Sequence, residues 1–388
     1  MIKKILCNSK GQIKLWVIII AVLIMIVVVV LLLQKDSEQG EVKGISQEQP
    51  IKIGAILPLT GKIAQYAEEA RRGIEMALEQ EKDLKLEIVY EDSKSDAKEG
   101  VSAYQRLQTM DLPILITGAS PISLAISPLA NQDEILQMGV FSSVSKYTSP
   151  NDFTFRVTVR SEVENKKIAG WAIEQGYRKF ALLYTNSDWG MSHYNFIKSE
   201  LERLGGKIIV EENFLETSND FKTQLIKIKN KEPEAIFLLA RSQNAGMILK
   251  QAKELGLQTH FFGVRAVEAQ ELLDIAGDSA QGIFYPYSFN PNSENKRVKD
   301  FVDNYQSKYQ EIPTAYVAEG YDAMSLIIKS IKQCEGADSQ CLKDDLLGTK
   351  DYQGVLGNIT FDENGDVFYD MFIKTVRNGE FIPYSSDD

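Results

Sequence analysis

The sequence predicts an α/β protein with two similar lobes, each a parallel-rich sheet flanked by helices. Short apolar runs alternate with amphipathic stretches, which is typical of βα units. This rhythm occurs twice, once before Ser149 and once after Arg178. The folded part is expected to start near Ile51. The roughly 340 residues from there to the end exceed one core of ordinary size, so two lobes are expected.

The expected strands are short apolar or β-branched runs. They cover 51–57, 84–90, 114–117, 139–142, 179–184, 207–212, 235–239 and 260–263. Helices are expected where apolar residues recur at spacings of three and four. They cover 66–81, 96–109, 163–175, 189–204, 221–230, 245–255, 294–309 and 316–332. Residues Asp362 to Asp366 are expected to form a turn between strands, because the later ligand positions of a calcium loop are missing.

The N-terminal region contains an unbroken apolar run of eighteen residues from Trp16 to Leu33. This length suffices to cross the hydrocarbon core as a helix and exceeds most signal-peptide cores. Lysines precede the run, so residues 1–15 are expected in the cytoplasm and the bulk of the chain outside it. No small-residue cleavage pattern follows, which favours an uncleaved anchor at 16–33 over a removed signal. Residues 34–50 are polar and aperiodic, as expected of a linker.

Composition and motifs argue against several classes of function. The net charge is −11 and the basic residues are scattered, so no nucleic-acid partner is expected. The two histidines, His193 and His260, lack neighbours at metal-ligand spacing, and His193 is expected on the surface of a helix. No phosphate-cradling glycine-rich loop and no G-x-S-x-G elbow occurs. We therefore expect no metal, no cofactor and no enzymatic activity.

Two cysteines lie close together late in the chain. Cys334 and Cys341 are separated by six residues in a compartment that permits oxidation. A disulfide between them would close a short polar loop. Two unpaired thiols are the less favoured alternative outside the cytoplasm.

Polar side chains follow the expected strands at their carboxyl ends. This is the edge where open α/β sheets bind ligands, beside the exposed amides of helix N-termini. The segments concerned are Thr60 to Tyr66, Gly118 to Ser123, Ser142 to Ser145, Asn186 to Gly190, Ala240 to Asn244 and Gly263 to Ala266. Their hydroxyls, aromatic rings and arginines suit a polar small molecule and suit catalysis poorly.

Several phrases occur in an order that resembles a known family. They are GKIAQY ending at Tyr66, AKELGL ending at Leu257, IAGDSAQG ending at Gly282, EGYDA ending at Ala323 and ITFDENGD ending at Asp366. From Ile51 to Phe381 the chain resembles the type I periplasmic binding proteins of the leucine/isoleucine/valine-binding group. The resemblance implies a hinged cleft that encloses a ligand, and an ATP-powered membrane permease that receives it.

The resemblance also implies how the chain divides. Three crossovers are expected, near Thr158, near Pro286 and between Tyr352 and Asp366. Lobe 1 then comprises 51–158 and 288–352, and lobe 2 comprises 159–287 and 353–388.

The pocket that the resemblance implies is formed by both lobes. Matching positions are Tyr66, Ser123, Val144, Ser145, Trp189 and Tyr316, although Ser120 could take the place of Ser123. Arg265 differs from the family's pattern, because it occupies the position where amino-acid binders carry an acid for the ligand's ammonium group. Arg241 adds a second cation at the neighbouring strand end.

These arginines favour a carboxylate through charge-assisted hydrogen bonds, so they predict a ligand of net negative charge, such as a dicarboxylate or an aromatic acid. The alternative is that they pair within the protein, with Glu268, Glu271 or Glu319.

Three classes of function follow from this reading. The first is a membrane-tethered, extracytoplasmic solute-binding protein of an ABC importer, with a carboxylate-bearing ligand or, alternatively, a branched-chain or other amino acid. The second is a ligand-sensing receptor domain, for which neither end of the chain offers an evident signalling module. The third is an enzyme, which the missing base, nucleophile and metal site disfavour.

Overall fold

The computed structural model describes residues 49–110 and 112–385. The expected cytoplasmic segment 1–15, the membrane span 16–33 and nearly all of the linker lie outside the described residues. Within the described residues, no helix has the length and apolar character needed to span a bilayer. Gln49–Asp388 forms one compact unit.

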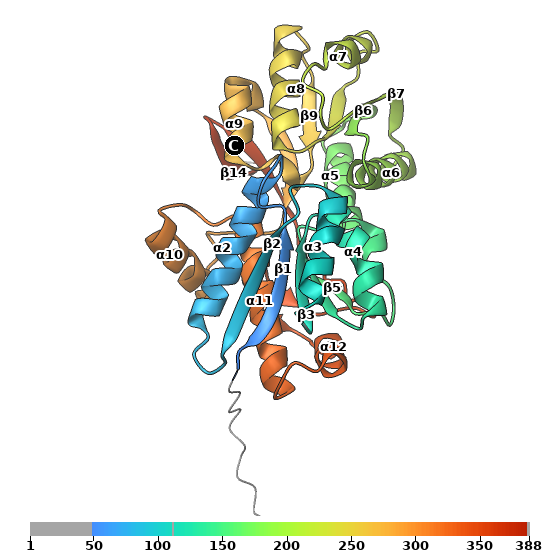
Figure 1. Ribbon diagram of the computed structural model, residues 1–388. Helices are drawn as coiled ribbons and strands as arrows, with labels where there is room; N and C mark the ends of the chain where they lie inside the picture. Colours follow the sequence, from blue (N-terminus) through green and yellow to red (C-terminus); the bar gives the residue numbers. More distant parts are fainter. Residues whose placement is uncertain (1–48, 111, 386–388) are drawn as a thin grey trace, which may run out of the picture. The chain divides into compact units, whose positions relative to one another are not determined.

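Lobe 1 is built on a five-stranded parallel sheet in the order β2-β1-β3-β4-β5 (Figure 1). The strands are β1 (Ile51–Leu57), β2 (Leu86–Asp92), β3 (Ile114–Gly118), β4 (Leu136–Val140) and β5 (Thr154–Arg156). Helices α2 (Ala64–Gln80), α3 (Ala97–Gln108) and α4 (Ser120–Gln132) connect the first four. The central strands β3 and β4 are buried at every position, as expected of parallel strands that are covered on both faces.

Lobe 2 contains a seven-stranded mixed sheet in the order β14-β13-β10-β9-β8-β6-β7. Its parallel strands are β6 (Lys179–Thr185), β7 (Lys207–Phe214), β8 (Ala235–Leu239), β9 (His260–Gly263) and β10 (Ile283–Tyr287). The antiparallel strands β13 (Phe372–Arg377) and β14 (Glu380–Pro383) complete it. Its helices are α5 (Ser161–Glu174), α6 (Asp188–Arg203), α7 (Lys222–Lys229), α8 (Ser242–Glu254) and α9 (Gln270–Ala276), with 3-10 turns η2 (Arg265–Val267) and η3 (Gly277–Ala280). The two-lobed α/β fold predicted from the sequence is confirmed.

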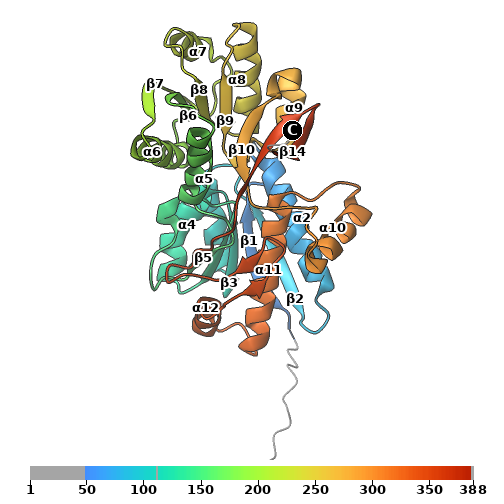
Figure 2. The ribbon, with the colours of Figure 1, turned by 180° about the vertical axis from the view of Figure 1, so that it is seen from behind.

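After β10 the chain returns to lobe 1. Helices α10 (Lys296–Tyr309), α11 (Ala315–Gln333) and α12 (Ser339–Leu347) follow, then the short strands β11 (Tyr352–Gln353) and β12 (Asn358–Ile359). Helix α11 lies beside α2 in both views (Figures 1 and 2). The two helices approach so closely because glycines lie at the crossing. A Cβ on Gly320 would lie 2.0 Å from the Ala70 carbonyl oxygen, and one on Gly73 would lie 2.0 Å from that of Val317.

The last crossover lies later in the chain than we expected. Residues 353–366, which we expected in lobe 2, contact lobe 1. The buried carboxylate of Asp322 in α11 accepts hydrogen bonds from the backbone amides of Val355 and Leu356, at 2.9 Å each. The carboxylate needs such donors because it is fully buried. The chain therefore passes to lobe 2 between Asp366 and β13 (Figure 2).

The structure contains the predicted disulfide between Cys334 and Cys341. Cys334 caps the C-terminus of α11 and Cys341 lies in α12, so the bond ties these helices together at the end of the loop. Asp362 to Asp366 forms a turn in which Gly365 has a positive φ of 80°. The turn ends at Asp366, whose carboxylate enters the core of lobe 1.

Candidate functional site

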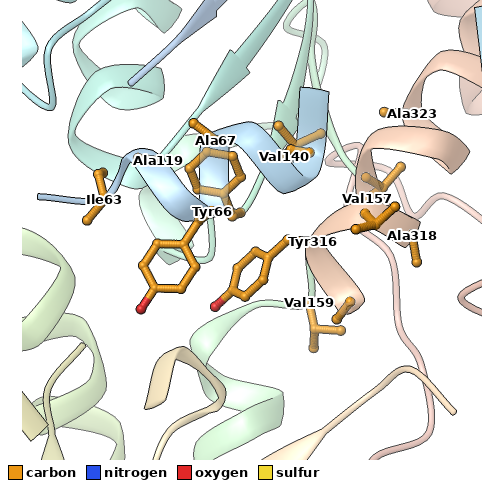
Figure 3. Close-up of a cluster of buried hydrophobic side chains, with 14 of the residues drawn as sticks. Ile63, Tyr66, Ala67, Ala119, Val140, Val157, Val159, Tyr316, Ala318 and Ala323 are labelled. Carbon is orange, nitrogen blue, oxygen red and sulfur yellow. The ribbon is translucent and has the colours of Figure 1, made fainter. Parts of the chain in front are cut away.

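Two tyrosines of lobe 1 lie together at the edge that faces lobe 2. Tyr66 is in the first turn of α2 and Tyr316 is in the first turn of α11. Their ring centroids are 4.7 Å apart, and the close helix crossing at Gly73 and Gly320 holds the two helices in this position. Figure 3 shows both hydroxyl groups pointing the same way, out of an apolar cluster that includes Ile63. The two rings are thus fixed in an apolar cluster, and their hydroxyl groups point out of it.

The Tyr66 hydroxyl group reaches across to lobe 2. It donates to the carbonyl oxygen of Ala266 at 2.8 Å and lies 2.8 Å from the hydroxyl oxygen of Ser242. Ser242 is the first residue of α8, and its backbone amide donates to the same tyrosine oxygen at 3.3 Å. Lys62 adds a bond from its ammonium group to the Glu216 carbonyl at 2.9 Å. The structure is therefore a state in which the lobes touch at the carboxyl ends of their strands.

Arg265 lies at the centre of this contact. Its guanidinium group forms ion pairs with Glu319 of α11 and with Glu164 of α5. It also stacks over the Tyr316 ring, 5.0 Å from the centroid. All three charged side chains are buried, with exposures of 4 % for Arg265 and 1 % for each glutamate. Arg265 therefore pairs with carboxylates within the protein. One of them, Glu319, is among the three glutamates that we considered from the sequence.

The two glutamates differ in how fully they are bonded. Glu319 also accepts hydrogen bonds from the backbone amide of Phe141 at 2.7 Å and from the hydroxyl of Thr158 at 2.9 Å. Glu164 Oε1 lies 3.0 Å from Arg265 Nε and accepts from no backbone amide or hydroxyl group among the described residues. Burial raises the pKa of Glu164 to about 7, against the lowering effect of Arg265.

The serines of lobe 1 that could contact a ligand lie in the first turn of α4 and in the loop after β4. Ser123 Oγ is 2.6 Å from Ser142 Oγ, and Ser120 Oγ accepts from the Val144 amide at 3.4 Å. Ser145 begins the 3-10 turn η1 (Ser145–Tyr147), and its buried Oγ has no hydrogen-bond partner in the part of the chain that the structure describes. The hydroxyl groups of Ser120 and Ser123 therefore already bond to residues of the loop after β4. The Ser145 hydroxyl group remains available to bond a ligand.

Lobe 2 contributes an aromatic and a cation opposite this loop. The Arg241 guanidinium lies 4.3 Å from the centroid of the Trp189 ring, and its Nε is 3.3 Å from a Glu216 carboxylate oxygen. Lys146 and Asp188, the neighbours of Ser145 and Trp189 in sequence, pair across the lobes at 3.3 Å. The loop that carries Ser145 therefore faces the start of α6.

His193 is not on the surface as we expected. It is 1 % exposed, its ring centroid is 4.8 Å from that of Trp189, and its Nδ1 lies 3.0 Å from the side-chain oxygen of Asn165. Burial, reinforced by the nearby arginines at 241 and 265, lowers its pKa to about 3. It is therefore a neutral polar residue behind the tryptophan. Our expectation failed because His193 lies on the buried face of α6, in line with Trp189, Ile197 and Leu201.

Sequence reasoning did not single out Glu164, Ser242 or Ala266. Glu164 stands among other charged residues in α5, so nothing in its local pattern distinguishes it from a solvated acid. Glu319 appeared in the family-like phrase EGYDA, but only its pairing with Arg265 shows a role. Among residues 49–110 and 112–385, no group of histidine, cysteine and carboxylate side chains is arranged to hold a metal ion.

Comparisons with known proteins identify the family to which the chain belongs. The family model described as periplasmic binding protein matches residues 50–380. The leucine-, isoleucine-, valine-, threonine- and alanine-binding protein of Pseudomonas aeruginosa is 26% identical over 328 residues, which cover 82% of this chain and 87% of that protein.

Two solved structures show the same fold. A leucine-binding protein from Thermotoga maritima superposes with a TM-score of 0.83 at 26% identity, covering 86% of this chain and 98% of that one. A solute-binding protein of an ABC transporter from Rhodopseudomonas palustris, in complex with 3,4-dihydroxybenzoic acid, gives 0.78 at 24% identity, covering 87% and 96%. The second likeness shows the fold alone. The chain belongs to the periplasmic binding proteins, in the group whose relatives are named leucine-, isoleucine- and valine-binding proteins.

Proposed function

We propose that this chain is an extracytoplasmic, membrane-tethered solute-binding protein that captures a small carboxylate-bearing ligand for an ABC importer. The observation that carries the proposal is the contact between lobes at the strand ends, where Tyr66 bonds Ser242 and Ala266. Such a contact supports a ligand site between two walls that a hinge can separate. The role needs no catalytic group, so the proposal includes no enzymatic activity.

The residues proposed to line the ligand site come from both lobes. They are Tyr66, Ser123, Val144, Ser145 and Tyr316 of lobe 1 and Trp189, Arg241 and Arg265 of lobe 2. The free hydroxyl group of Ser145 supports a place for the ligand carboxylate on lobe 1. The ligands in the names of the relatives, leucine and 3,4-dihydroxybenzoic acid, share a carboxylate. Because Arg265 already pairs with two glutamates, its charge no longer argues for a ligand of net negative charge.

Ligand capture can be tested on residues 51–388. Thermal unfolding is measured with a panel of amino acids and aromatic acids, and calorimetry follows for each compound that raises the midpoint. We expect at least one carboxylate-bearing compound to bind. Ser145→Ala should weaken that compound by about 10-fold or more, as loss of a hydrogen bond to a charged group does. Ser149→Ala, in an exposed turn, is the matched control and should leave affinity unchanged. Binding that is equal in both variants would remove Ser145 from the site, and no binding at all would contradict the proposed function.

The tether is proposed from the apolar run at 16–33 and its flanking lysines. We expect the full-length protein in the membrane fraction with its N-terminus intact. N-terminal sequencing that starts after Leu33 would show that the segment is a cleaved signal instead.

A further inference from the structure

We propose that closing of the two lobes takes up a proton at Glu164, so that mild acid favours the closed state of the protein. The inference goes beyond the proposed function, because it concerns the protein without ligand as well. Only its consequence for ligand affinity rests on that function. Glu164 is in the first turn of α5, in lobe 2, and shares the guanidinium group of Arg265 with Glu319 of lobe 1.

The first argument is the number of charges that closing brings together. Arg265 and Glu164 belong to the same lobe, so one cation and one anion stay paired when the lobes separate. Closing adds Glu319 from the other lobe. When all three groups are ionised, the closed cluster holds one guanidinium group and two carboxylates, all of them buried. Burying a net charge is costly, and a proton on one of the acids removes that cost.

The second argument is the difference between the two acids. Besides pairing with Arg265, Glu319 accepts hydrogen bonds from Phe141 and Thr158, two donors of its own lobe that stabilise its ionised form. Glu164 Oε1 has the contact with Arg265 but accepts from no backbone amide or hydroxyl group among the described residues. Burial raises the pKa of Glu164 to about 7, since Arg265 lowers it less and Glu319 raises it further. The proton is therefore assigned to Glu164.

The other groups around the cluster do not titrate near neutral pH or are paired among themselves. They are Tyr316 of α11, Tyr369 of the last crossover and His193 of α6, and on α5 itself Arg160 and Glu162. Burial raises the pKa of both tyrosines well above the ordinary value. Burial, with the nearby arginines, lowers the pKa of the histidine to about 3. Arg160 and Glu162 lie 4.0 Å apart and pair with each other.

The direction of the effect follows from the two states of Glu164. Opening removes Glu319 from the cluster and admits water, so the pKa of Glu164 should return towards its ordinary, lower value. An acid whose pKa is higher in the closed state favours closing when it is protonated. This contribution is fully present below the pKa of the open state and is lost as the pH rises through about 7. From about pH 8 to about pH 6, the ratio of closed to open molecules should therefore rise about 10-fold.

Distance measurements on the protein without ligand test the proposal. Residues 51–388 carry spin labels on cysteines at Ser102 in α3 of lobe 1 and Lys231 after α7 of lobe 2, both exposed. Distance distributions are recorded at about pH 8 and about pH 6, and the fraction at the distance of the structure described here is taken as closed. We expect the ratio of closed to open molecules to be about 10-fold higher at the lower pH. An equal ratio at both pH values would overturn the proposal.

Glu164→Gln identifies the acid that takes up the proton. Glutamine keeps the size but does not titrate, so the ratio should be the same at both pH values. Glu69→Gln is the matched control, because burial also raises the pKa of Glu69 to about 7, whereas its carboxylate accepts from Thr314 of its own lobe. This variant should keep the change with pH. A change that persists in Glu164→Gln, or that is lost in Glu69→Gln, would overturn the proposal. The comparison of the unmodified protein at two pH values stands even if a variant fails to fold.

Calorimetry with L-leucine and benzoate extends the test to ligand capture. Neither compound changes its own charge between about pH 6 and about pH 8, so a change in affinity reports on the protein. The affinity of residues 51–388 for the compound that binds should be about 10-fold higher at the lower pH, and nearly independent of pH in Glu164→Gln. Affinity that does not change with pH in the unmodified protein would overturn the proposal. If neither compound binds, the proposed function loses support, and the distances in the free protein still decide whether closing takes up a proton.

Discussion

Replacing Gly320 by alanine is expected to destabilise the protein by about 3 kcal/mol or more, at the upper end of the cost of overpacking. The new Cβ would lie 2.0 Å from the carbonyl oxygen of Ala70, a backbone atom that cannot turn aside. Helix α11 would have to move away from α2, and this movement would also separate Tyr316 from Tyr66. Urea unfolding of residues 51–388 measures the loss of stability.

Gly170→Ala is the matched control, since Gly170 lies in α5 and a Cβ added there would have no heavy atom within 4 Å. Alanine at this position should stabilise the helix by up to about 1 kcal/mol. Equal unfolding free energies for the two variants would show that the crossing of α2 and α11 adapts to a side chain. In that case the close approach would not be what positions the two tyrosines.

Replacing Arg156 by methionine should cost about 3–5 kcal/mol, the range for breaking a buried ion pair by removing one partner. The side chain is fully buried, and its Nε lies 2.5 Å from a carboxylate oxygen of Asp366. Its Nη1 donates to the carbonyl oxygens of Ser142 and Val144 at 2.9 and 2.8 Å. The variant would leave Asp366 with the more distant Arg160, at 3.4 Å, and would release the loop that carries Ser145. Chemical unfolding and ligand affinity should therefore both decline.

Two further variants distinguish the loss of the buried ion pair from a general loss of stability. Combining Arg156→Met with Asp366→Asn should recover part of the lost stability, because no uncompensated carboxylate then remains in the core. Arg106→Met removes a half-exposed arginine that pairs with Glu91, and should leave the unfolding free energy nearly unchanged, because solvent screens an exposed ion pair. If the double variant is no more stable than Arg156→Met, the cost arises from the released carbonyls instead.

Much of the fold was predictable because both sheets are largely parallel. Buried parallel strands read as apolar runs, and the helices between them show the spacing of an amphipathic surface. The sequence reading missed α4, where Pro121, Pro128 and several serines interrupt the helical pattern, although a proline in the first turn is compatible with a helix. It also missed β5, which has three residues, and the antiparallel strands β13 and β14 near the C-terminus. Strand β13 pairs with β10, which is distant in the sequence, whereas β5 and β14 pair with the preceding strands β4 and β13.

The site was predictable only as a set of positions. Strand ends and helix starts identified Tyr66, Trp189 and Arg265, and the structure places Arg265 against Tyr316. The sequence could not show that Arg265 pairs with Glu164 and Glu319, because the two acids are 155 residues apart and meet the arginine only in the folded chain. Glu164 belongs to the same lobe as Arg265, whereas Glu319 comes from the other lobe. The charge of Arg265 therefore does not by itself support the prediction of a ligand of net negative charge, because that prediction counted the cation without the carboxylates around it.

The most direct test of the account is the distance between the lobes with and without ligand. Cysteines at Ser102 in α3 and Lys231 after α7, both exposed, carry spin labels for pulsed distance measurement on residues 51–388. The only native cysteines in that range are held in the disulfide. The probe is the amino acid or aromatic acid that gives the largest rise in unfolding midpoint. Without the probe, we expect a broad distribution of distances between the spin labels. With the probe bound, we expect one narrow distribution that matches the structure described here, in which the lobes touch. In Tyr66→Phe, which lacks the bonds to Ser242 and Ala266, the distribution should shift back towards the broad one. A distribution that stays the same when calorimetry shows the probe to be bound would contradict the claim that the ligand is enclosed by closing lobes.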